Sequence, residues 1–127
     1  MKDTKKIIVI DDDPDIVTFL TTLMEDNGYE TVSASNGKEG LAKAQKERPD
    51  LILLDITMPE KSGVKCYREM REDSDLKLIP VVIVTGVADE FKNFIYTRRQ
   101  VPPPDGYVSK PVNKKELLDI ISRLLPV

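Results

Sequence analysis

Three short apolar runs recur along the chain, and each of them ends in a polar residue. They cover residues 7–10, 51–54 and 81–84, and two shorter segments at 30–33 and 107–109 also have the composition of strands. Unbroken aliphatic runs of this length are typical of strands that are covered on both faces of a sheet. The pattern therefore predicts five strands.

A helix is expected after each strand. Asp13 can cap the first helix, with Pro14 at its first position and Gly28 at its end. Asn36, with Glu39 three residues later, resembles a capping box that opens the second helix. The other helices are expected after a loop at 59–63, around Phe91, Phe94 and Ile95, and after Asn113 and Glu116, with the apolar stripe Leu117, Ile120, Ile121 and Leu124.

Strands that alternate with helices require a parallel sheet with right-handed crossovers, so helices cover both of its faces. The predicted fold is therefore α/β, a doubly wound (βα)5 domain of three layers that takes in residues 1–127. In open sheets of this kind, ligands bind beyond the carboxyl ends of the strands. That edge is where functional residues are expected.

Composition narrows the class of protein. Apolar residues make up 40% and charged residues 32% of the chain, which is typical of a globular domain. The net charge of -3 disfavours direct binding to nucleic acid. No apolar segment is long enough for a membrane span or a signal peptide. The single cysteine, Cys66, suits a reducing compartment, so a cytoplasmic protein without membrane contact is expected.

Polar residues with related chemistry follow four of the predicted strands. Asp11 and Asp12 come after the first strand, Asp55 after the third, Thr85 after the fourth and Lys110 after the fifth. Each residue alone is weak evidence, because turns favour Asp and Thr in any protein. Together they indicate a site, because the carboxyl ends of parallel strands meet at one edge of the sheet.

Three carboxylates in one cleft repel each other unless a cation lies among them. Magnesium suits this position because it prefers oxygen ligands and usually keeps waters and substrate phosphate in its shell. A carboxylate can also accept a phosphoryl group covalently, and this transfer depends on position and charge neutralisation. The chain has 0 histidines, so any histidine in the reaction must come from another molecule.

Four motifs occur in order: Ile-Asp-Asp-Asp-Pro at 10–14, Leu-Leu-Asp-Ile-Thr-Met-Pro at 53–59, Val-Thr-Gly at 84–86 and Tyr-Val-Ser-Lys-Pro at 107–111. Over essentially the whole chain they resemble the receiver domain of bacterial response regulators. The resemblance implies a flavodoxin-like sheet with strand order 2-1-3-4-5. It also implies a phosphoacceptor in a two-component phosphorelay, which takes its phosphoryl group from a sensor histidine kinase or a phosphotransfer protein.

The resemblance further implies a role for each site residue. Asp55 is the phosphorylation site, and Lys110 and Thr85 bind phosphoryl oxygens. Mg2+, or Mn2+ in its place, is held by Asp12 directly and by Asp11 largely through water. Asp55 and the backbone carbonyl of Thr57 complete the protein ligands. Thr85 and Tyr107 form the switch, and the Lys110–Pro111 bond is expected to be cis. The simpler interpretation of Tyr107 is an edge-strand aromatic that packs on the last helix.

The same resemblance implies an output domain or target protein that docks on the fourth helix, fifth strand and fifth helix. It implies a monomer or a weak phosphorylation-dependent dimer, which catalyses only its own phosphorylation and dephosphorylation and is not otherwise an enzyme. The separation between Thr85 and Lys110 is 25 residues, which is longer than is usual in the family, so the region of the fourth helix departs from the family pattern. Neither Thr57 nor Val87 can orient an attacking water, so a long-lived phosphoaspartate is expected.

Three alternatives stay open. A degenerate receiver would serve only as a docking module. An aspartyl-phosphate phosphatase would need a second Asp two residues after Asp55, where this chain has Thr57. A flavin-binding module shares the architecture, but aspartates at 11–13 would repel the phosphate of its ligand.

Overall fold

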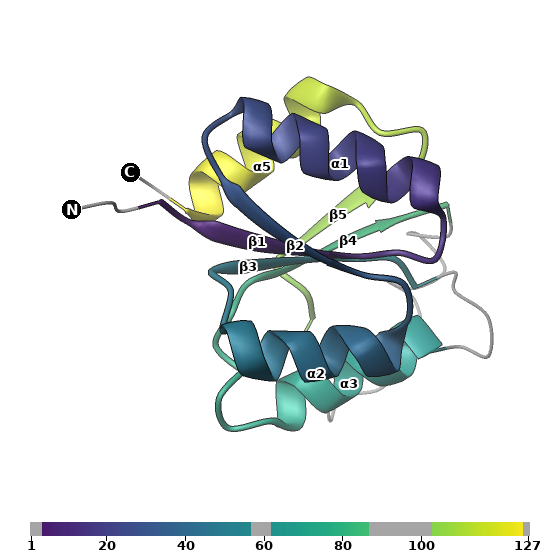
Figure 1. Cartoon of the computed structure of the whole chain (residues 1–127), viewed down its shortest axis with the longest axis vertical. Helices are drawn as coiled ribbons and strands as arrows, with labels where there is room; N and C mark the ends of the chain where they lie inside the picture. The colour runs from purple at the N-terminus through teal and green to yellow at the C-terminus, as the bar shows by residue number, and fades with distance from the viewer. Residues whose placement is uncertain (1–3, 57–61, 87–102, 126–127) are drawn as a thin grey trace.

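The computed structural model describes residues 4–56, 62–86 and 103–125 (Figure 1). Its five strands are all parallel and lie in the order β2-β1-β3-β4-β5, which confirms the predicted topology. The strands are β1 Lys6–Ile10, β2 Glu30–Ala34, β3 Leu51–Leu54, β4 Val81–Thr85 and β5 Gly106–Ser109.

The described helices are α1 Pro14–Asp26, α2 Gly37–Glu47, α3 Ser62–Glu72 and α5 Lys114–Leu124. Figure 1 shows α1 and α5 on one face of the sheet and α2 and α3 on the other, so the molecule has three layers. The helix expected around residues 91–95 lies outside the described residues. Within the described part of the chain, the structure holds no helix that is both long and apolar enough to span a membrane.

The helix starts agree with the capping signals in the sequence. Side-chain oxygens of Asp13, Asn36 and Asn113 accept hydrogen bonds from backbone N–H groups in the first turns of α1, α2 and α5. Gly28 follows α1 with a φ of 91°, a left-handed conformation that glycine adopts without steric cost. One detail of the capping box differs from expectation. The Glu39 carboxylate accepts a hydrogen bond from the N–H of Ser35 at 2.6 Å, one residue before the Asn36 cap.

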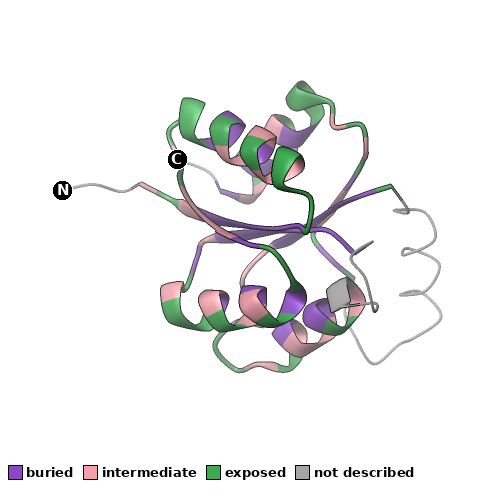
Figure 2. Ribbon diagram, turned by 45° about the vertical axis from the view of Figure 1, so that its right-hand side comes forward, coloured by how far each residue is buried: buried purple, intermediate pink, exposed green. Residues whose placement is uncertain are grey.

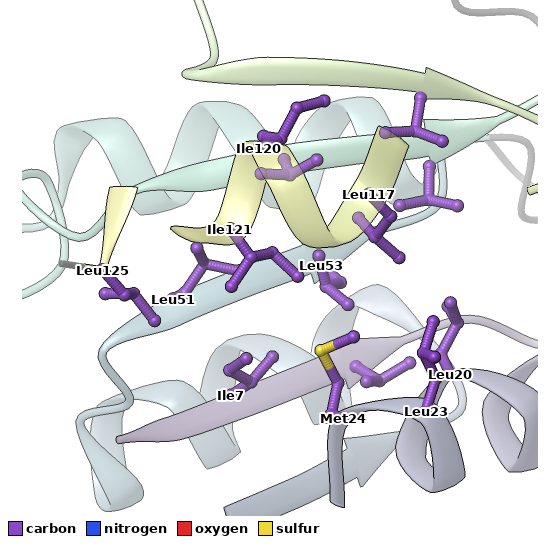
Figure 3. Packing of buried hydrophobic residues seen from close by; sticks show 14 residues of the cluster. Ile7, Leu20, Leu23, Met24, Leu51, Leu53, Leu117, Ile120, Ile121 and Leu125 are labelled. Atoms are coloured by element: carbon purple, nitrogen blue, oxygen red, sulfur yellow. The ribbon is translucent and has the colours of Figure 1, made fainter. Parts of the chain in front are cut away.

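Strand side chains alternate between two hydrophobic clusters, one on each face of the sheet. Toward α1 and α5, Ile7 and Leu53 pack with helix residues that include Met24 and Ile121 (Figure 3). Toward α2 and α3, strand residues that include Ile8 and Ile52 pack with Tyr67 and Met70 of α3. Figure 2 shows the buried residues concentrated along the strands and on the helix sides that face them. Because both faces of the sheet centre are covered, residues 7–10 of β1, 51–54 of β3 and 81–84 of β4 are all apolar and buried, whereas β2 also carries polar residues.

Candidate functional site

The site lies where the four strands β1, β3, β4 and β5 end beside one another. Asp11 directly follows β1, Asp55 follows β3, Thr85 ends β4 and Lys110 follows β5. Two backbone bonds extend the sheet to this level, from Asp55 N–H to Ile10 O at 2.9 Å and from Lys110 N–H to Thr85 O at 3.1 Å. The sheet therefore brings together residues that are far apart in the sequence, as predicted from the strand ends.

Lys110 joins two of the carboxylates. Its Nζ lies 3.1 Å from Asp11 Oδ2 and 3.4 Å from Asp55 Oδ2. Both aspartates are only 2% exposed, whereas the lysine side chain is 24% exposed. Buried carboxylates need a partner of opposite charge, because desolvation strongly disfavours them when they are unpaired. Lys110 supplies that charge from the solvent side of the site.

Asp11 is held from two directions. Its Oδ1 accepts a hydrogen bond from Asp13 N–H at 2.9 Å, while Oδ2 faces Lys110. Burial, the largest effect, raises the pKa of the Asp11 carboxyl above its ordinary value, and the negative charge of Asp55 adds to this. The Asp13 N–H and Lys110 act in the opposite direction but do not cancel the rise. The site therefore holds more negative charge than Lys110 alone can neutralise.

The ammonium group of Lys110 is stabilised by the same arrangement. Burial, the largest single effect on its pKa, favours the neutral amine, but the hydrogen bond to Asp11 and the charges of Asp55 and Asp11 outweigh it. The pKa of Lys110 is therefore raised, and the residue carries a full positive charge at neutral pH. It is suited to bind a second anion that enters the site.

The donor set fits a hard divalent cation. Asp11, Asp12 and Asp55 each offer one carboxylate oxygen, and these oxygens all lie within 4.8 Å of one another. Two of the carboxylates are buried and Asp12 is exposed, so an ion bound there would keep access to water and ligands. A groove of about 490 Å³ opens beside Asp11 and Asp12, between α1 and the start of α2. Thr57, expected to contribute a backbone carbonyl, lies outside the described residues.

The predicted switch residues occupy different surroundings. Thr85 is fully buried at the end of β4. Tyr107 is half-buried in β5 next to Ile83, and it packs against the cluster on the α2 and α3 face. Tyr107 also lines a groove with Ile120 and other residues of α5, so both neighbouring layers border it. Its role as a switch stays a prediction.

The sequence led us to expect one feature of Lys110, its cis peptide bond to Pro111, but not another, its contact with Asp11. The Lys110–Pro111 peptide bond is cis. Sequence reasoning assigned Lys110 only to the phosphoryl oxygens and missed its contact with Asp11. The available signal was that Lys110 is the one cation among the polar residues that follow the predicted strands.

Comparisons with known proteins agree with this geometry. The family model described as the response regulator receiver domain matches residues 7–122. PilH of Pseudomonas aeruginosa is 35% identical over 120 residues, which cover 94% of this chain and 97% of that protein. DivK of Brucella anthropi is 33% identical over 121 residues, with 95% and 96% covered. The transcriptional regulatory protein PhoP of Bacillus subtilis is 34% identical, but the match covers only 45% of its length.

Solved structures show the same likeness. The chemotaxis response regulator CheY4 of Vibrio cholerae superimposes with a TM-score of 0.83 at 32% identity, over 96% of this chain and 99% of that one. A receiver domain protein from Methanospirillum hungatei gives a TM-score of 0.82 at 31% identity, over 94% and 92%. Since both the sequence match and the fold extend over nearly all of its length, this chain belongs to the response regulator receiver family.

Proposed function

We propose that this protein is the phosphoacceptor of a bacterial two-component phosphorelay and that Asp55 receives the phosphoryl group. The observation that carries the proposal is the convergence of Asp55 with Asp11, Asp12 and Lys110 at the carboxyl edge of the sheet. The donor would be a phosphohistidine on a sensor histidine kinase or phosphotransfer protein, because the chain contains no histidine. We place the exchange in the cytoplasm, in keeping with a single cysteine.

In the proposed transfer, an oxygen of the Asp55 carboxylate forms a bond to phosphorus. The bond between phosphorus and the donor's imidazole nitrogen breaks, and that nitrogen keeps the electron pair. No base is needed, because the carboxylate attacks in its ionised form. Lys110 would pair with one phosphoryl oxygen and the Thr85 hydroxyl would donate a hydrogen bond to another, so that both neutralise charge as it develops.

Asp11, Asp12 and Asp55 would hold Mg2+, with the Thr57 carbonyl as a further ligand. When bound, the ion would supply positive charge that offsets the negative charge gathered in the site during the transfer. Mn2+ prefers the same oxygen ligands and would replace it. The three convergent carboxylate oxygens support this assignment, because they are the donor type that hard cations take.

Phosphorylation would give Lys110, which now pairs with Asp11 and Asp55, a phosphoryl group as a further anionic partner. A phosphoryl group adds about 1.5 to 2 negative charges. Lys110 would then exchange part of its contact with Asp11 for the phosphoryl oxygens, and Thr85 would move toward them. We expect Tyr107 to respond on β5 and to alter the surface that β5 and α5 present to an output domain or target protein. A monomer, or a weak dimer formed on phosphorylation, is expected.

We propose that the chain catalyses only its own phosphorylation and dephosphorylation. A phosphatase of the aspartyl-phosphate type would need an acid at position 57, where this chain has threonine. Because neither Thr57 nor Val87 offers a carboxylate or amide to orient water, we expect the phosphoaspartate to persist for longer than minutes in Mg2+. Loss of the phosphoryl group within minutes, with no phosphatase present, would contradict this expectation.

Intact mass measured after treatment with acetyl phosphate and MgCl2 tests the proposal. The parent chain should gain one phosphoryl group, and Asp55→Asn should gain none. Asp119→Asn, which changes an exposed aspartate of α5, is the matched control and should be labelled like the parent. A mass gain that survives Asp55→Asn would refute the assignment of the site. A parent chain that takes no label would favour the docking-only alternative.

A further inference from the structure

A buried arginine lies at the amino edge of the sheet, opposite the candidate site. The Arg71 side chain, at the end of α3, is only 6% exposed. Its guanidinium lies over the Tyr67 ring at 5.1 Å and donates to Tyr67 Oη at 3.1 Å. It also donates to the backbone oxygens of Lys77 at 3.2 Å and Ile79 at 2.9 Å, and to Asp105 Oδ2 at 2.8 Å. Such a buried charge is tolerated only where several acceptors share it.

Asp105 connects this arginine to two strands. Its Oδ2 also accepts a hydrogen bond from Val81 N–H at 2.9 Å, and its own N–H donates to Val81 O at 2.8 Å. Val81 is the first residue of β4, and Asp105 is the residue just before β5. The Asp105 side chain therefore satisfies the N–H of Val81 at the edge where the β4–β5 ladder begins.

β5 is a short strand at the edge of the sheet. It has four residues, pairs with β4 alone among the described strands, and has only Val108 fully buried. A shift of one residue would turn Tyr107 to the opposite face of the sheet and displace Lys110. The ladder is held at its far end by the bond from Lys110 N–H to Thr85 O. Before the start of the strand, Asp105 bonds to Val81 through both its N–H and its carboxylate.

We propose that Arg71 and Asp105 are positioning residues for Lys110, because their ion pair sets the register in which β5 joins β4. The five residues from Asp105 to Lys110 span roughly 17 Å of extended chain. An anchor at the amino edge can therefore control where the lysine side chain meets Asp55. This proposal rests on the proposed role of Lys110 in binding the phosphoryl group.

A second ion pair of the same chemistry serves as the control. Arg48 Nη2 lies 3.2 Å from Asp75 Oδ2, and the two side chains are 63% and 54% exposed. The pair joins the end of α2 to the turn after α3, and neither residue hydrogen-bonds to β4 or β5 in the described structure. Asp75→Ala therefore removes an Arg–Asp pair without changing the anchor of β5.

Residue-resolved amide exchange on the unphosphorylated chain tests the structural part of the proposal. Asp105→Ala should speed exchange of the Lys110 N–H, relative to Ile8 N–H in the central strand β1, by about 10-fold or more, because local opening becomes easier. Asp75→Ala should leave this ratio unchanged. An equal increase at Lys110 and Ile8 would mean that Asp105 only adds to global stability, and would overturn the proposal.

The rate of phosphorylation by acetyl phosphate tests the functional part. Asp105→Ala should slow labelling of the folded protein by about 10-fold, because a small displacement of a charge-stabilising group is costly. In a Lys110→Ala background the same change should have no further effect, since the two substitutions act through one group. Equal slowing in both backgrounds would refute the proposed route through Lys110.

Two conservative variants keep the test valid if Asp105→Ala does not fold. Asp105→Asn retains an acceptor for Val81 N–H, and Arg71→Lys retains the charge but loses the planar fork. Both variants should speed exchange of the Lys110 N–H and slow labelling, as expected for Asp105→Ala, but by smaller factors. A parent chain that takes no label would refute the proposed function, whereas the exchange measurement would still decide whether Asp105 sets the register of β5.

Discussion

At the residue scale, the carboxylates of the site are placed for ligand binding at a cost to the resting fold. Asp11 and Asp55 are buried beside each other and share ion pairs with Lys110, and Asp12 lies close by. Burial and the charge of Asp55 raise the pKa of Asp11, which shows that its ionised form is disfavoured there. A cation that binds all three should therefore stabilise the folded chain.

We predict that MgCl2 raises the thermal unfolding midpoint of the parent chain and that Asp12→Asn loses most of this increase. At 100 times its dissociation constant, a ligand adds about 2.7 kcal/mol to the free energy of unfolding. Differential scanning calorimetry in MgCl2 and in chelator measures the difference. Asp15→Asn, an exposed aspartate in the first turn of α1, is the control and should keep the full increase. The same increase in Asp12→Asn would contradict the ligand set.

A glycine in α2 lies close against a side chain of β1. A Cβ at Gly40 would lie 2.6 Å from Ile10 Cδ1, and Ile10 is fully buried at the end of β1. On an open helix surface, replacing glycine by alanine would stabilise by about 1 kcal/mol. Here the new methyl group has no space, so the sign should reverse.

We predict that Gly40→Ala lowers the free energy of unfolding by about 1–3 kcal/mol, the usual cost of overpacking. Adding Ile10→Val, which removes Cδ1, should recover part of the loss. Urea denaturation of the single and double variants measures both effects. An increase in stability in Gly40→Ala alone would show that the helix can shift away from the strand.

At the element scale, the Glu39 carboxylate stabilises the start of α2 by binding Ser35, the residue before the Asn36 cap. Glu39 Oε1 accepts hydrogen bonds from Ser35 N–H at 2.6 Å and from Ser35 Oγ at 3.1 Å. The backbone N–H of Ser35 is the largest cause of the lowered pKa of Glu39, followed by its hydroxyl. The contribution to stability is therefore present above the ordinary pKa of 4.5 and is lost as the pH falls through the lower folded value.

We predict that Glu39→Gln unfolds more easily than the parent at pH 7 and that the difference shrinks as the pH falls below 4.5, the ordinary pKa of the residue. Urea denaturation over this pH range gives the measurement. Glu116→Gln, at the matching position of α5, is the control, since no backbone N–H of the described residues bonds its carboxylate. A difference that does not change with pH would argue against the Ser35 contact.

At the scale of the whole molecule, Lys110 joins the last strand to the first. It contacts Asp11 across 99 residues of sequence and Asp55 across 55, so it links β5 to β1 and β3. Removing the lysine would leave two buried carboxylates without their cation, which is more damaging than losing an exposed pair. A divalent cation in the same site should replace part of that charge.

We predict that Lys110→Ala lowers the free energy of unfolding by about 1–3 kcal/mol in chelator, and by less in MgCl2. Lys115→Ala breaks an exposed pair with Asp119 and should change stability by less than about 1 kcal/mol. Chemical denaturation under both conditions provides the comparison. An equal loss in chelator and in MgCl2 would show that the ion does not compensate for the lysine.

Much of the fold was predictable because its signals are local. Apolar runs that stop at Asp11, Asp55 and Thr85 mark strands covered on both faces, and capping residues such as Asp13 and Asn36 mark where helices begin. These features depend on a few neighbouring residues and on strand and helix periodicity. The parallel order and the gathering of site residues at one edge follow from the alternation of strands with helices.

Only the tertiary structure decided which distant side chains meet. The bridge from Lys110 to Asp11, the bonds of Arg71 with Asp105 and the approach of Gly40 to Ile10 leave no pattern in their local sequence. Each depends on how strands and helices pack at distances of a few ångströms, which local propensity does not specify. The sequence thus determined the elements and the chemistry available at the sheet edge, while packing decided the contacts that position that chemistry.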